Sequence, residues 1–94
     1  NIADEKQVIK MFECIDHDFG RLDVLVNNAG ILFTQCSIAE LDSERINKIF
    51  TVNVTGTMIC SREAVKRMST MAGGSGGVIV NLSSRAAIWG SPNE

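Results

Sequence analysis

The stretch Leu22-Asp23-Val24-Leu25-Val26-Asn27-Asn28-Ala29-Gly30 decides the fold. Its first part is almost continuously apolar, which is typical of a strand buried on both faces of a parallel sheet. Residues 22–28 are therefore predicted to form a strand. The small and amide residues that follow suit a nucleotide, because ligands of open α/β sheets bind outside the carboxyl ends of the strands.

The segments around this strand alternate between helical and strand patterns. A helix is predicted from about residue 4, and Gly20 ends it. After a loop over 31–42 with one short turn, Asp42 or Ser43 begins a helix that runs to about Thr70. The remaining predictions are a glycine-rich connection over 73–77, a strand over 78–83, and a loop over 85–94 in which Pro92 disfavours a helix. This helix-strand-helix-strand order is the middle of a βαβ progression in an α/β protein.

The long helix carries apolar residues on more than one side, so we expect it to be covered twice. One stripe is predicted to pack on the sheet, and the other side is predicted to contact a neighbouring subunit. The sheet-facing stripe consists of Ile46, Phe50, Asn53, Thr57, Cys60, Ala64 and Met68, and a second stripe of Ile49, Val52, Gly56 and Ile59.

Composition excludes several functional classes. The 94 residues are 45% hydrophobic and carry a net charge of −2, without a basic stripe for nucleic acid or an apolar run long enough for a membrane span. Cys14, Cys36 and Cys60 lack metal-ligand spacing, so we predict free thiols of a cytoplasmic protein and no metal site. His17 is interpreted as a solvated residue near a helix end. The first residues look like an internal cut, so we expect a slice of a larger domain.

Two further motifs follow the first in order. Asn53-Val54-Thr55-Gly56 lies inside the long helix, and Asn81-Leu82-Ser83-Ser84 comes directly after the second strand. With Asn27-Asn28-Ala29-Gly30, they resemble the short-chain dehydrogenase/reductase family, and the resemblance extends over essentially all 94 residues. The look is closest to bacterial oxidoreductases of the glucose or sugar dehydrogenase type. It implies the central slice of a Rossmann-type, doubly wound parallel sheet.

The resemblance implies an NAD(P)-dependent oxidoreductase that moves hydride between nicotinamide and a small alcohol, sugar or ketone. It makes Ser84 and Asn53 catalytic residues, and it makes Asn27, Ala29 and Gly30 cofactor-binding. Many relatives have an adenine-binding Asp at the position of Asn1, and an Asn oxygen still accepts that bond. Family members pair the long helix in a four-helix bundle, so a homo-oligomer, a dimer or tetramer through residues 43–70, is expected.

Two parts of the family pattern fall outside the sequence. The glycine-rich cofactor loop belongs before Asn1, and the Tyr-x-x-x-Lys pair belongs shortly after Glu94. Residues 1–94 are therefore expected to be a partial NAD(P)-binding domain that is inactive alone. The choice between NAD and NADP, the substrate, the direction of reaction and the oligomer size depend on features outside these motifs.

Structural alternatives stand beside each motif. The functional interpretation is favoured, but a chain turn also explains Asn27 to Gly30, a hydrogen-bonded core amide explains Asn53, and hydroxyls at a strand end explain the two serines. The rival function is a non-catalytic nucleotide-binding or assembly module on the same scaffold. A serine hydrolase ranks third, because no GxSxG turn surrounds Ser83 or Ser84.

Overall fold

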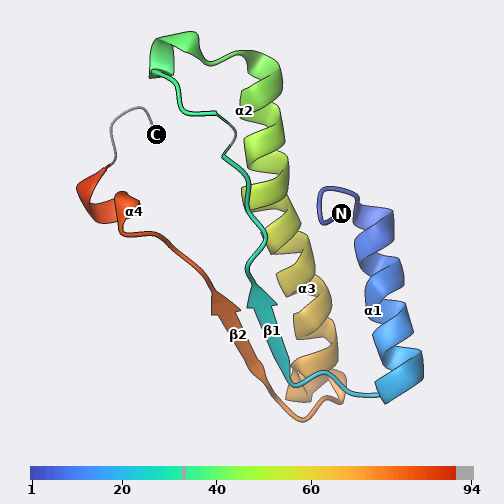
Figure 1. The fold of residues 1–94 in the computed structure, drawn as a ribbon. Helices are drawn as coiled ribbons and strands as arrows, with labels where there is room; N and C mark the ends of the chain where they lie inside the picture. Colours follow the sequence, from blue (N-terminus) through green and yellow to red (C-terminus); the bar gives the residue numbers. More distant parts are fainter. Residues whose placement is uncertain (33, 91–94) are drawn as a thin grey trace.

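The computed structural model describes residues 1–32 and 34–90. The predicted order of helix, strand, long helix and strand is confirmed (Figure 1). Two 3-10 turns and a short helix complete the chain. The elements are α1 (Glu5–Phe19), β1 (Val24–Asn27), η1 (Ile38–Glu40), α2 (Ser43–Phe50), η2 (Thr51–Gly56), α3 (Thr57–Met68), η3 (Thr70–Ala72), β2 (Val78–Asn81) and α4 (Ala86–Trp89).

Helix α1 has a polar side chain at its start and a glycine at its end, as its sequence predicts. The Asp4 carboxylate accepts hydrogen bonds from the backbone N–H groups of Lys6 and Gln7, at 3.0 and 3.3 Å. These bonds satisfy N–H groups that the helix itself leaves unpaired. Gly20 adopts a φ of 69°, in the left-handed region, and its N–H returns to the Asp16 carbonyl.

The two strands pair in parallel, with Val24 opposite Val78 and Asn27 opposite Asn81. Both are shorter than predicted: β1 begins at Val24 and ends at Asn27, and β2 begins at Val78, as predicted, but ends at Asn81. Ahead of β2, the Gly76 N–H bonds to the Met68 carbonyl at 2.7 Å, which ties the connection to the end of α3. Beyond β1, the backbone of Ile31 bonds to a side chain of the long helix instead of to a strand.

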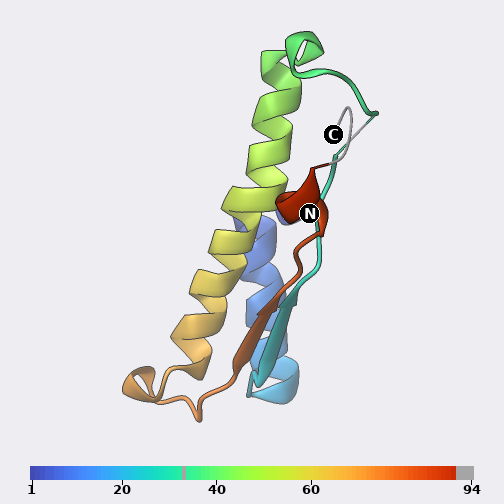
Figure 2. The same cartoon turned by 90° about the vertical axis from the view of Figure 1, so that its left-hand side faces the viewer.

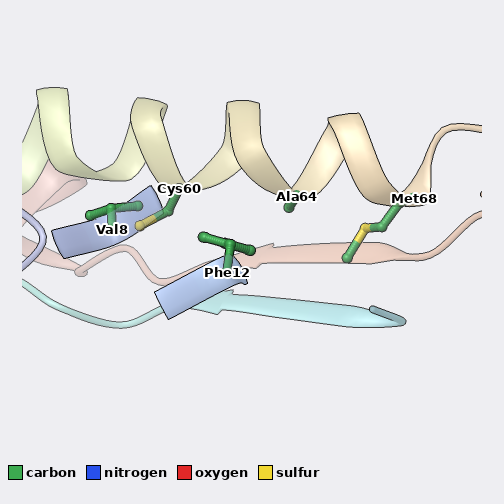
Figure 3. Packing of buried hydrophobic residues seen from close by; sticks show 5 residues of the cluster. All are labelled: Val8, Phe12, Cys60, Ala64 and Met68. Carbon is green, nitrogen blue, oxygen red and sulfur yellow. The ribbon is translucent and has the colours of Figure 1, made fainter. Parts of the chain in front are cut away.

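The hydrophobic core lies between α1 and α3, over one face of the sheet. Val8 and Phe12 from α1 meet Cys60, Ala64 and Met68 from α3 (Figure 3). Leu25 and Ile79, which point toward these helices from the strands, pack partly against the cluster. The other face of the sheet is uncovered: its valines, Val24, Val26, Val78 and Val80, are all exposed.

The predicted sheet-facing stripe of the long helix is correct only for its second half. Cys60, Ala64 and Met68 are buried as expected, whereas Ile46 and Phe50 are exposed. Two features explain the difference. Helix α2 extends beyond the strand ends (Figures 1 and 2), and the π-helical η2 interrupts the α-helical spacing of the stripe.

The predicted loop over 85–94 contains a short helix, α4. The Trp89 N–H bonds to the Arg85 carbonyl at 3.1 Å, and the Arg85 guanidinium lies 4.1 Å from the centre of the Trp89 ring. Alanines favour such a turn, and the cation–π contact stabilises it. The prediction about Pro92 concerns a residue outside the described ones.

A buried carboxylate on α3, that of Glu63, is surrounded by three cationic side chains of the same helix. Glu63 accepts bonds from Lys66, Arg62 and Arg67, at 3.1, 2.9 and 3.2 Å. The Arg67 guanidinium also donates two hydrogen bonds to the Asp16 carboxylate on α1, at 2.8 and 2.9 Å. Burial raises the pKa of the Glu63 carboxyl, but the three hydrogen bonds outweigh burial and lower that pKa to about 2.

Candidate functional site

Two neighbouring cavities share Ala29 and Gly30, which follow β1. The larger, of about 1120 Å³, reaches from these residues to Asn1 and to the outer side of α2. The smaller, of about 340 Å³, lies at the carboxyl ends of both strands. Its lining includes the residues that the sequence motifs single out: Asn27, Asn28, Ala29, Gly30, Asn53, Thr57, Asn81, Leu82, Ser83 and Ser84.

The side chain of Asn27 ties the two strand ends to the long helix. Its amide nitrogen donates to the side-chain amide oxygen (Oδ1) of Asn81 at 2.8 Å and to the Ser61 hydroxyl at 3.1 Å. The backbone carbonyl of Asn27 accepts the Leu82 N–H at 3.2 Å. Asn27 therefore holds the segment that leads to Ser83 and Ser84. The sequence did not identify Ser61; its only signal was a hydroxyl next to the buried stripe residue Cys60.

Asn53 clamps the chain directly after Gly30. Its amide nitrogen donates to the Ile31 carbonyl and its amide oxygen accepts the Ile31 N–H, both at 2.8 Å. Asn53 faces the carboxyl ends of the strands, where it lines the smaller cavity, but the apolar surroundings expected for it are not found, because Phe50 and Val54 are exposed. The amide is fully engaged with backbone, as the structural alternative required. The catalytic role of Asn53 stays a prediction.

Gly56 accounts for part of the irregular helix. It ends η2 and is buried against Ile2, where an added Cβ would come within 2.9 Å of the Ile2 carbonyl oxygen. A glycine inside a helical pattern indicates close packing or a local kink, and Gly56 is both closely packed and part of an irregular helical segment. A π-helical segment inside an α-helix often marks a functional site, and here it carries Asn53.

The described protein neighbours of Gly30 leave room for a larger side chain than hydrogen. A Cβ added there would meet only the Asn53 amide oxygen, at 3.5 Å, which is an ordinary contact. Ala29 is exposed beside it. The two residues thus leave an accessible backbone at the point where the two cavities join. A cofactor that must approach backbone closely fits this arrangement.

The two serines and Asn1 lie at opposite ends of the paired cavities. Ser83 and Ser84 are exposed on the smaller cavity. Asn1 lines the larger one; its amide oxygen accepts the Ala3 N–H at 2.9 Å and keeps a second lone pair. The single histidine, His17, bonds to Asp18 in the last turn of α1 and lines neither cavity. Within residues 1–32 and 34–90, His17 therefore shares no cavity with Ser83 or Ser84.

Metal binding, membrane spanning and thiol chemistry were the remaining possibilities for the residues that the structure covers. Within 1–32 and 34–90, no group of three metal-binding side chains comes together. None of the helices there has the length and apolar character needed to cross a membrane. Cys14, Cys36 and Cys60 are free thiols, and burial raises the pKa of Cys60.

Comparison with known proteins agrees with the geometry. The short chain dehydrogenase family profile matches residues 1–94. An uncharacterized oxidoreductase of Escherichia coli K12, YgfF, is 57% identical over 94 residues, which are all of this chain and 38% of that protein. The chain spans about a third of the length of the curated relatives it matches.

Solved structures give the same result. ElxO with NADP bound superposes with a TM-score of 0.86 at 40% identity, covering 99% of this chain and 36% of ElxO. NAD⁺-bound xylitol dehydrogenase gives 0.85 at 32% identity, over 98% of this chain and 34% of that enzyme. The predicted Rossmann-type α/β fold is confirmed.

Proposed function

This chain belongs to the short-chain dehydrogenase family, and from that membership we propose that it is the central part of an NAD(P)-dependent oxidoreductase. The observation that carries the proposal is the meeting of Asn27 to Gly30, Asn53 and Ser84 around one cavity. In this proposal a longer chain supplies the glycine-rich cofactor loop and the Tyr-x-x-x-Lys pair. Residues 1–94 alone would then be an inactive partial domain.

The cofactor, NAD or NADP, would lie along the two joined cavities. Ala29 and Gly30 would let its ribose approach the backbone, and the Asn1 amide oxygen would accept a bond from the adenine amino group. Asn27 would support the site indirectly, because its hydrogen bonds to Asn81 and Ser61 hold the strand ends and the long helix together. Bound there, the cofactor supplies or takes up the hydride.

Ser84 would bind the reacting oxygen of the substrate. Its hydroxyl lies on the cavity at the strand ends, so it can donate a hydrogen bond to a carbonyl oxygen or accept one from an alcohol. As charge develops on that oxygen, a fixed donor stabilises the transition state. The proton itself would pass through the tyrosine of the longer chain, and the backbone carbonyl of Asn53 would hold a water in the relay to its lysine.

The substrate is proposed to be a small alcohol, sugar or ketone. The small volume of the cavity around Ser84 supports it. The similarity to a xylitol dehydrogenase structure is a second, independent support.

A homo-oligomer is proposed to form through the long helix. Ile46, Phe50, Val54 and Met58 recur every four residues along it, and all are exposed. A continuous apolar surface of this kind marks an interaction site. We propose a cytoplasmic location, which the three free cysteines support.

The test is hydride transfer by the full-length protein. Purified protein would be mixed with NADH or NADPH and a panel of ketones and aldehydes, or with NAD or NADP and xylitol and other small alcohols, and nicotinamide absorbance followed. Turnover that Ser84→Ala abolishes would support the oxidoreductase. Cofactor binding without turnover of any substrate would favour the alternative, a non-catalytic module on the same scaffold.

A further inference from the structure

The segment between β1 and α2 is fastened to the long helix at two places. Ile31 is held by the nitrogen and the oxygen of the Asn53 side-chain amide. Further along, the Arg45 guanidinium donates to the Leu32 carbonyl at 2.9 Å, to the Thr34 carbonyl, and to the Cys36 thiol at 3.1 Å. Arg45 thus contacts three residues of a loop that lies outside the two paired strands.

The position of Arg45 is itself fixed by the start of α2. Asp42 caps this helix, and its carboxylate accepts the Arg45 backbone N–H at 2.8 Å. The guanidinium is a planar fork with several donors, so it can satisfy separate carbonyls at one time. Arg45 is only partly exposed, and the carbonyls it binds are backbone groups that need partners wherever water is excluded.

The fastened loop begins at the proposed cofactor site. Ile31 lines the larger cavity together with Ala29 and Gly30, and Leu32, the first carbonyl held by Arg45, is the next residue. A change in the path of Leu32, Thr34 and Cys36 would therefore act on that cavity through the adjoining Ile31. Displacements of about 1 Å in groups that position a ligand are enough to cost roughly 100-fold in rate.

We propose that Arg45 is a positioning residue: by holding Leu32, Thr34 and Cys36 it fixes the path of the loop next to Ile31, which lines the nucleotide site, and thereby sets cofactor affinity. The inference rests on the proposed function for the identity of the ligand. It concerns a residue that touches neither the reacting atoms nor the two serines.

The test uses the full-length protein with Arg45→Ala and Arg45→Lys, and with Arg21→Lys as the matched control. Arg21 is an exposed arginine that binds an exposed Asp23 at 2.5 Å, away from both cavities. NADH and NADPH affinity would be measured by fluorescence titration, and amide hydrogen exchange would be followed in residues 31–37. We expect about a 10-fold rise in Kd and faster exchange confined to the loop in both Arg45 variants.

Guanidinium ion added to Arg45→Ala should restore part of the affinity, which a general loss of structure would not allow. Unchanged Kd in Arg45→Ala with a loosened loop would overturn the inference, as would faster exchange throughout the chain. These outcomes are separate from a failure of the proposed function. If wild-type protein binds neither NADH nor NADPH, the proposed function fails. If wild-type protein binds the cofactor and the Arg45 variants bind it equally well, the result counts against the inference alone.

Discussion

At the scale of the residue, two glycines of this chain are small for opposite reasons. Gly56 has no room for a side chain, because Ile2 fills the space where a Cβ would lie. Gly30 has room, since among the described residues a Cβ there would meet the Asn53 amide oxygen alone, at 3.5 Å. Packing explains the first glycine, and the proposed approach of a cofactor would explain the second.

Gly30→Ala should therefore separate binding from stability. We expect the melting temperature to stay close to that of wild type, because the added methyl meets only an ordinary contact. The Kd for NADH or NADPH should rise about 10-fold, and Ala29→Leu should raise it further. Thermal unfolding and fluorescence titration of the full-length protein check both parts. Wild-type affinity in Ala29→Leu would refute a cofactor role for this turn.

The two serines should differ in their contribution to catalysis. Ser84→Ala is expected to lower kcat/KM about 100- to 1,000-fold, the usual result of removing a fixed donor to developing charge. Ser83→Ala should cost less, although both line the same cavity. Steady-state kinetics of the two variants rank them. The reverse ranking would assign the substrate contact to Ser83.

At the scale of the element, the π-helical stretch η2 is the feature that sequence periodicity missed. The spacing of apolar residues predicted one continuous helix, and its bounds are nearly right. Helical periodicity assumes one turn per 3.6 residues, so it cannot place side chains correctly across a wider turn. Asn53, which lies in this segment, bonds to Ile31 beyond the end of β1 instead of packing among the apolar residues expected around it. The motif order, by contrast, correctly brought Asn27, Asn53 and Ser84 to one edge, because parallel strands end together.

Gly56→Ala tests the packing of η2 against the start of the chain. Alanine is usually better than glycine inside a helix by about 1 kcal/mol. Here we expect a loss of about 2 kcal/mol in the free energy of unfolding, because the new methyl meets the Ile2 backbone. Urea unfolding measures it, with Thr55→Ala, an exposed position of the same segment, as the control. A stabilised Gly56→Ala protein would contradict this packing.

The Glu63 cluster predicts a dependence of stability on pH. Its carboxyl pKa is about 2 in the folded protein, below the ordinary value of 4.5. A lowered pKa stabilises the fold above the ordinary value, and this stabilisation is lost as pH falls toward about 2. Glu63→Gln should lower the free energy of unfolding by about 2 kcal/mol near neutral pH, with the difference shrinking below about pH 4. Urea titrations across this range check it, and a constant difference would show that the charge is not involved.

At the scale of the whole molecule, the chain is covered on one side only. Helices α1 and α3 protect one face of the two-stranded sheet, while four valines cover the other face and are exposed. The sequence predicted strands buried on both faces, which residues 1–94 do not show; in the proposed longer chain, further elements would cover the valines. The end of β1 could not be predicted from local sequence, since the Ile31 backbone that follows it bonds to Asn53, far along the chain.

The exposed apolar stripe of the long helix should govern assembly. We expect Met58→Glu and Phe50→Glu, each made alone, to convert the proposed oligomer of the full-length protein to smaller species. A charge cannot be buried in the interface without a partner. Met71→Glu is the control, since Met71 is 99% exposed on η3, outside the stripe. Light scattering after gel filtration gives the mass. An unchanged mass in both stripe variants would locate the interface elsewhere.

The parallel pairing of β1 with β2 also has a kinetic consequence. Val24 and Val78 are partners, although the whole long helix separates them along the chain. Closing so long a loop costs entropy before any strand contact repays it. Helix formation, by contrast, takes about a microsecond or less. We therefore expect the helices to form first and the strands to meet last, so the Asn27 bridge that completes the site would be among the final events of folding.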